Sequence, residues 1–69
     1  MELTAEQIDQ NYSALLDSVT VIKNGKPEFM SDSDWAGMVD RNKEHLKIML
    51  EKPYWTDAHD LSPIRAILA

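Results

Sequence analysis

Two apolar stripes at helical spacing constrain the fold of this chain more than any other feature. The first stripe consists of Ile8, Tyr12, Leu15, Leu16, Val19 and Ile22. The second consists of Trp35, Met38, Val39, Leu46, Met49 and Leu50. At about 100° per residue, each set falls within an arc of roughly 120° on a helix. The pattern predicts two amphipathic helices that each bury one face.

The ends of the first helix are marked by local signals. Thr4 followed by Gln7 is a capping box, in which the side chain of each residue can bond the backbone N–H of the other. Gly25 suits a helix C-cap, and Pro27 cannot continue a helix because it lacks an N–H. We expect a helix over about residues 5 to 23.

A competing interpretation exists at the end of this helix. Residues 19 to 22 are rich in β-branched side chains and precede Asn24-Gly25, which is also a β-hairpin signal. Pro27 would then stand in the second strand, where it is poorly tolerated. The long helical periodicity upstream also favours the helix.

The second helix has similar boundaries. Ser31 and Asp34 repeat the N-terminal capping pattern, and Pro53 prevents the helix from continuing. These signals predict a helix over about residues 32 to 52. The loop between the two helices is short, so the helices should be antiparallel neighbours.

The end of the chain predicts one more helix. Ser62 is a suitable N-cap and Pro63 suits the first helical position, which indicates a short helix over about residues 63 to 68. The expected fold class is all-α, with one domain over residues 1 to 69. Its architecture is an antiparallel helical hairpin followed by a short C-terminal helix.

The size of the chain predicts self-association. A chain of 69 residues has room for only a small core, and small domains usually need a disulfide, a metal or oligomerisation for stability. The absence of cysteine excludes disulfides and the commonest structural zinc sites. We therefore expect a homo-oligomer, in the form of a dimeric four-helix bundle.

The charge and hydropathy patterns exclude several classes of partner. Seven basic and twelve acidic side chains give a net charge of -5, which disfavours nucleic-acid binding because phosphates are held largely by Lys and Arg. No apolar run is long enough to span a membrane, and the N-terminus lacks the pattern of a signal peptide. We expect no membrane association and a location in the cytoplasm.

The sequence contains no recognisable catalytic motif. His59 lies between Asp57 and Asp60, but no matched cluster elsewhere would complete a metal or acid–base site, so we interpret it as a loop cap. His45 should lie partly buried at the helix seam. We expect no enzyme activity, no cofactor and no metal.

Several residues are candidates for protein contacts. Asn42 falls near the centre of the second stripe, where a buried amide would fix the register of an assembly; the alternative is an amide that reaches solvent. Tyr54 and Trp55 follow Pro53 as adjacent aromatics, which either anchor an interface or cap a small core. The residues predicted to make protein contacts are Tyr54, Trp55, Trp35, Asn42, Met49, Ile48 and Val21.

The C-terminal half carries three further patterns. Residues 42 to 50 read Asn-x-x-His-Leu-x-x-Met-Leu, residues 54 to 56 read aromatic-Trp-Thr, and residues 60 to 63 read Asp-Leu-x-Pro. In these patterns the chain resembles small uncharacterised accessory proteins of phages and prophages, of the type encoded near tail or morphogenesis genes. The resemblance implies no enzyme activity and supplies no catalytic residues.

The expected function is therefore protein binding. The chain would act as a homo-oligomeric assembly or accessory factor of a phage or prophage, contacting another phage or host protein. The alternative is a small acidic phage inhibitor that binds and modulates a host protein.

Overall fold

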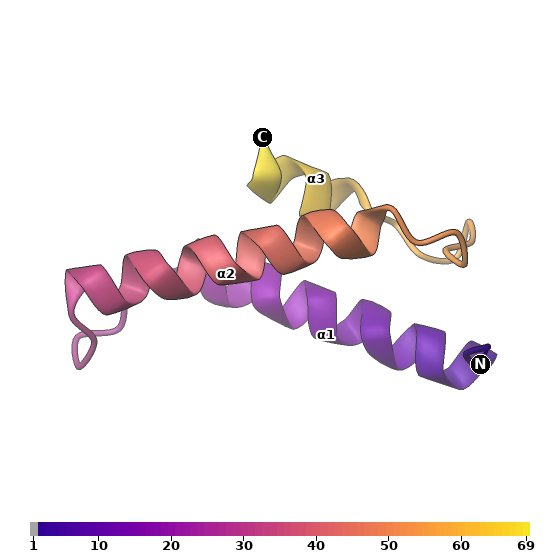
Figure 1. Ribbon diagram of the computed structural model, residues 1–69, viewed down its shortest axis with the longest axis horizontal. Helices are drawn as coiled ribbons and strands as arrows, with labels where there is room; N and C mark the ends of the chain where they lie inside the picture. The colour runs from indigo at the N-terminus through magenta and orange to yellow at the C-terminus, as the bar shows by residue number, and fades with distance from the viewer. Residues whose placement is uncertain (1) are drawn as a thin grey trace.

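The protein is all-helical, as expected. The computed structural model describes residues 2–69, which form α1 (Ala5–Asn24), α2 (Asp32–Leu50) and α3 (Ser62–Leu68), with no strand in this range. The chain reverses in the loop between α1 and α2, so that these two helices run in opposite directions (Figure 1). Residues 19 to 24 are helical, which excludes the β-hairpin interpretation.

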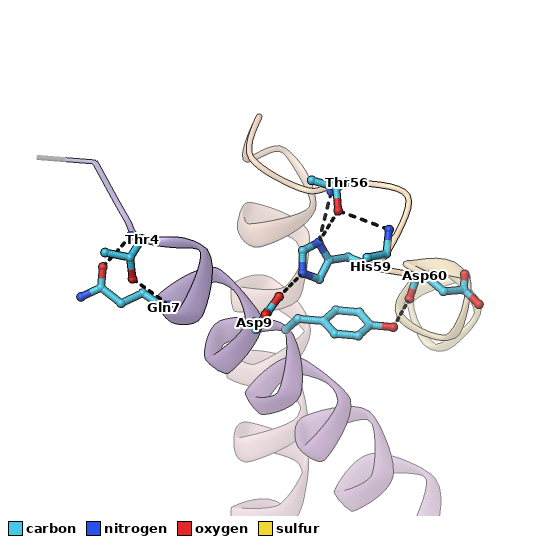
Figure 2. A network of polar contacts seen from close by, with 8 residues as sticks. Thr4, Gln7, Asp9, Thr56, His59 and Asp60 are labelled. Atoms are coloured by element: carbon cyan, nitrogen blue, oxygen red, sulfur yellow. Dashed lines mark hydrogen bonds and ion pairs between the residues drawn. The ribbon is translucent and has the colours of Figure 1, made fainter.

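The predicted capping box at the start of α1 is present. The Thr4 hydroxyl accepts the Gln7 N–H at 3.1 Å, and the Gln7 side-chain oxygen accepts the Thr4 N–H at 2.9 Å (Figure 2). At the other end, Gly25 has φ 83° and donates its N–H to the Ile22 carbonyl at 3.3 Å. The helix ends at Asn24, one residue beyond the expected boundary.

The second helix ends earlier than expected. Its start is as predicted, with the Ser31 hydroxyl accepting the Asp34 N–H at 3.2 Å. It stops at Leu50 rather than at residue 52. Glu51 donates to the Ile48 carbonyl and Lys52 to the Met49 carbonyl, which are bonds to the third residue back. The last turn therefore tightens before Pro53, whose ring disfavours a helical residue before it.

The predicted N-cap of the third helix was wrong by one residue. Ser62 is the first helical residue, and Leu61 occupies the N-cap position without a side-chain bond. The Asp60 carboxylate accepts the Ser62 N–H at 3.0 Å and so satisfies one of the free donors at this helix start. The sequence pattern placed the cap at Ser62 because serine is a favoured cap, whereas Asp60 supplies the bond from outside the helix.

Asp60 gives α3 a modest acid sensitivity. Hydrogen bonds from the Ser62 side chain and backbone lower the pKa of the Asp60 carboxyl from its ordinary value of 3.8. Because the folded-state pKa is the lower one, this carboxylate stabilises the fold above the ordinary pKa. That contribution is lost as the pH falls through the folded-state value.

The three helices meet in one small core. Its buried residues are Leu15 and Val19 of α1, Leu46 of α2 and Ile64 of α3. Partly buried apolar side chains surround them, namely Ile22, Met49, Leu50, Trp55, Leu61, Ile67 and Leu68. Over residues 2–69 these four are the only fully buried apolar side chains, so the core is thin for a chain with two long apolar stripes.

Most of the connection between α2 and α3, here called the tail segment (residues 55–60), is held against α1. The Tyr12 hydroxyl donates to the Asp60 carbonyl at 2.7 Å, and His59 Nε2 lies 2.7 Å from Asp9 Oδ1 (Figure 2). The Trp55 indole N–H donates to the Met49 carbonyl at 2.7 Å, which ties the same segment to the end of α2. These bonds fix the path by which the chain enters α3.

The two glycines provide a matched test of the backbone. Gly37→Ala should raise the free energy of unfolding by about 0.5–1 kcal/mol, because Gly37 lies inside α2 and a Cβ there would meet only the flexible end of Arg41, at 3.3 Å. Gly25→Ala should lower it by about 1 kcal/mol or more, because φ 83° strains a side-chain-bearing residue. Urea unfolding followed by circular dichroism measures both. Equal effects of the same sign would contradict the described geometry.

The contribution of the hydrogen bond from Tyr12 to the tail segment can be measured by removing the Tyr12 hydroxyl. Tyr12→Phe should lower the free energy of unfolding by about 1 kcal/mol, because it removes the donor to the Asp60 carbonyl and keeps the ring. Tyr54→Phe is the control, since it removes a tyrosine hydroxyl elsewhere in the chain and leaves the bond from Tyr12 to Asp60 intact. Thermal melts of both variants at one protein concentration give the comparison. A Tyr12→Phe variant as stable as the control would show that the bond contributes nothing.

Candidate interaction surface

The two flanks of α1 have different surroundings. Tyr12 and Asp9 lie on the flank that contacts the tail segment. Asn11 and Ala14 lie on the other flank, where α1 and the C-terminal half of α2 border a hollow of about 380 Å³. The lining residues of this hollow are Leu3, Asn11, Ala14, Leu15, His45, Met49, Lys52 and Tyr54. α1 and α2 diverge at the end of the hairpin that lies away from the connecting loop (Figure 1).

A second hollow continues the first toward the N-terminus. It is lined by Glu2, Leu3, Ile8, Pro53 and Tyr54, and it shares Leu3 and Tyr54 with the first. Leu3 is among the exposed large apolar side chains of the chain. The seam between α1 and α2 is therefore hollowed over the half of the hairpin that lies away from the loop.

The same flank continues along both helices toward the loop. Successive positions three or four residues apart share one side of a helix. By this spacing, α1 presents the row Asn11, Ala14, Ser18 and Val21. The antiparallel α2 presents the row Met38, Asn42, His45 and Met49. We call these eight residues the open face. None of them is fully buried, whereas α3 and the tail segment cover the opposite flank.

Most of the residues predicted to make protein contacts lie on or beside the open face. Val21, Asn42 and Met49 belong to it, and Tyr54 borders its hollowed end. Ile48 lies on the adjoining row of α2 and is 50 % exposed, compared with 47 % for Val21. Both side chains therefore lie at the surface of their helices.

The remaining two predicted contact residues lie elsewhere. Trp35 is half-buried in the first turn of α2, near the loop. Trp55 faces the inside of its own chain, where its ring meets Tyr12 at 6.3 Å and His59 at 5.5 Å between ring centroids, both edge to face. The indole N–H is also occupied within the chain. Of the two aromatics after Pro53, Tyr54 is therefore the one placed at the surface seam.

The side-chain amide of Asn42 uses its nitrogen, but not its oxygen, in a hydrogen bond within residues 2–69. Its amide nitrogen donates to the Met38 carbonyl at 2.8 Å, four residues back in the same helix. This bond satisfies a donor that would otherwise be costly at a half-buried position. The amide oxygen has no partner within residues 2–69, so Asn42 keeps one acceptor available on the open face.

The structure corrects the expectation for His45 and confirms the loop cap expected for His59. His45 is exposed, rather than partly buried, and lines the hollow. His59 does cap its loop, because the Thr56 N–H donates to Nδ1 at 3.2 Å, but it also reaches Asp9 of α1. An Nδ1 that accepts this bond leaves the proton on Nε2, which donates to the Asp9 carboxylate. The His59 side chain is only 7 % exposed.

Thr56, His59 and Asp9 resemble a nucleophile–base–acid relay in their order of contacts, since the Thr56 hydroxyl also lies 3.2 Å from His59 Nδ1. The hydroxyl accepts the Ala58 N–H at 3.2 Å, and the Thr56 carbonyl accepts the His59 N–H at 2.9 Å. These bonds close a tight turn. Both hollows are lined by other residues, so the trio is best described as a fastening of the tail segment. Sequence reasoning missed Asp9 because no local pattern links it to His59.

Within residues 2–69, no three His, Asp or Glu side chains are grouped so that they could hold a metal ion. None of the helices in this range has the length and apolar character needed to cross a membrane.

No family model, curated protein or solved structure matches this chain.

Trp55 should be the most important aromatic for stability. Trp55→Ala should lower the free energy of unfolding by about 3 kcal/mol, because it removes a ring packed on the core together with the bond to the Met49 carbonyl. Trp55→Phe keeps a ring and should lose less. Urea unfolding at a fixed protein concentration measures both, with Tyr54→Ala, at the neighbouring half-buried ring, as the comparison. If Tyr54→Ala were the more destabilising change, the inward placement of Trp55 would be contradicted.

Proposed function

We propose that this protein is a non-enzymatic protein–protein interaction protein that acts as a homo-oligomer, as an assembly or accessory factor of a phage or prophage. The observation that carries the proposal is the open face. One flank of the α1–α2 pair is covered by α3 and the tail segment, whereas the other presents half-buried apolar side chains and two adjoining hollows.

The thin core supports self-association in particular. Each square ångström of apolar surface removed from water contributes about 25 cal/mol, so a single chain with four fully buried apolar residues gains little beyond the entropy cost of ordering its backbone. A second copy would cover apolar side chains that one chain leaves half exposed, such as Met38 and Met49. Dimerisation would therefore contribute to stability as well as to function.

The role in phage or prophage assembly rests on the resemblance in the C-terminal half. Some residues of the patterns that carry this resemblance lie on the open face, and others lie in or beside the core. Asn42, His45 and Met49 lie on the open face, whereas Leu46 and Leu50 belong to the core and its surroundings. The polar residues around His59 are used to fasten the tail segment, which supports a binding role over a catalytic one.

Self-association is tested by sedimentation equilibrium. At micromolar concentrations the protein should sediment as a species of about twice the chain mass of 7.9 kDa, and its melting temperature should rise with protein concentration. A monomer that unfolds cooperatively, with a midpoint independent of concentration, would contradict the proposed homo-oligomer.

A further inference from the structure

We propose that two copies pair through their open faces about a two-fold axis parallel to the helices, so that α1 of each copy lies on α2 of the other. This inference rests on the proposed homo-oligomer and adds the surface and the geometry of the pair. We infer that a second copy of the chain covers the open face because the two edges of this face carry opposite charges. A two-fold axis parallel to the helices brings each edge opposite the other edge of the second copy.

The two edges differ in sign. By helical spacing, the outer edge of the open face on α1 carries Glu6 and Asp17, both exposed. The outer edge on α2 carries the exposed Arg41 and the neighbouring His45, and the exposed Lys52 lies two residues beyond the end of α2, where it lines the adjoining hollow. Asp34 is the one acidic residue on the α2 edge, and it lies in the first turn of that helix, near the loop. One edge is therefore acidic, and the other is basic over most of its length.

The charges on the two edges also lie at matching heights. Asn11 and Ala14 share a hollow with His45, Met49 and Lys52, which sets the pairing of the antiparallel helices. Nearer the N-terminus of α1, Glu6 lies at about the same height along the helix axes as Lys52. Nearer the loop, Asp17 lies at about the same height as Arg41 and His45.

Two symmetric arrangements are available to a pair of stacked hairpin faces. An axis perpendicular to the helices would place α1 on α1, so that the two acidic edges would meet. An axis parallel to the helices keeps each residue at its own height and places α1 on α2 of the other copy. Glu6 then faces Lys52 of the other copy, and Asp17 faces Arg41 and His45. Complementary charges favour this second arrangement and disfavour the first.

The centre of the open face fits the same pairing. Met38, Met49 and Val21 supply apolar surface, and Ala14 and Ser18 are small enough for helices to approach closely. In the proposed pair, Ser18 lies at the level of Asn42 of the other copy. Its hydroxyl is a donor of the kind that the free amide oxygen of Asn42 lacks within its own chain.

Charge reversal tests both the surface and the axis. The first variant is Glu6→Lys with Asp17→Lys, which makes both edges basic. The control is Asp40→Lys with Glu44→Lys, which changes the net charge by the same amount on the exposed side of α2 away from the open face. The third variant combines Glu6→Lys and Asp17→Lys with Arg41→Glu and Lys52→Glu, which exchanges the two edges.

Sedimentation equilibrium at low salt should show that the first variant dimerises at least about tenfold more weakly than the wild type, as like charges replace several exposed ion pairs. The control should keep the wild-type affinity, and the exchanged variant should regain most of it. Circular dichroism of each variant confirms that its helices are intact.

The outcomes separate the inference from the proposed function. A wild-type dimer whose affinity falls equally in the first variant and the control would overturn the charge-matched pairing and leave the homo-oligomer standing. A first variant that dimerises like the wild type would also overturn it, because the α1-on-α1 arrangement gains nothing and loses nothing on that change. A wild-type chain that remains monomeric would overturn the proposed function itself.

Discussion

The burial of Ile64 against α1 and α2 is the contact on which the rest of the structure depends. Leu15 and Val19 of α1 and Leu46 of α2 form a cluster that is completed only when α3 places Ile64 beside them. A helix of seven residues is too short to be stable alone, so α3 exists because of this packing and because its start is held by Asp60. Without it, two stripes would face each other across a narrow seam.

The position of α3 gives the hairpin two unlike flanks. The tail segment reaches α1 through Asp9 and Tyr12, which directs α3 to one side of the α1–α2 pair. The flank with Asn11 and Ala14 is left to border the hollow. The uncovered flank is therefore a consequence of where the short helix docks, and the hollow on that flank shares Leu15 and Met49 with the core and its surroundings.

Local features of the structure were predictable from the sequence because they depend on neighbours within one helical turn. The capping box at Thr4 and Gln7 and the cap at Ser31 involve residues three apart. The helix end at Gly25 follows from backbone freedom in the same way. Errors occurred where two local signals competed, as at Ser62, where the neighbouring Asp60 provides the bond.

The contacts that hold the tail segment had no such signal. His59 and Asp9 are 50 residues apart in the sequence and Tyr12 and Asp60 are 48 apart, so no spacing rule connects them. Phe29 is 88 % exposed in the loop between α1 and α2, although phenylalanine is usually buried. No local sequence pattern predicts this exposure. For the candidate surface, the sequence identified Asn42, Met49 and Val21 individually but could not show that they share a flank with Ala14 and His45.

The sequence by itself determined that this chain forms helices, where two of them begin, and which stripe each must bury, because helical periodicity and capping are properties of adjacent turns. Only the tertiary structure decided that Trp55 turns inward, that His59 reaches across to α1, and that one flank of the hairpin stays uncovered. The physical reason is that a stripe specifies how much apolar surface needs cover. Which partner supplies that cover depends on where distant segments meet in space.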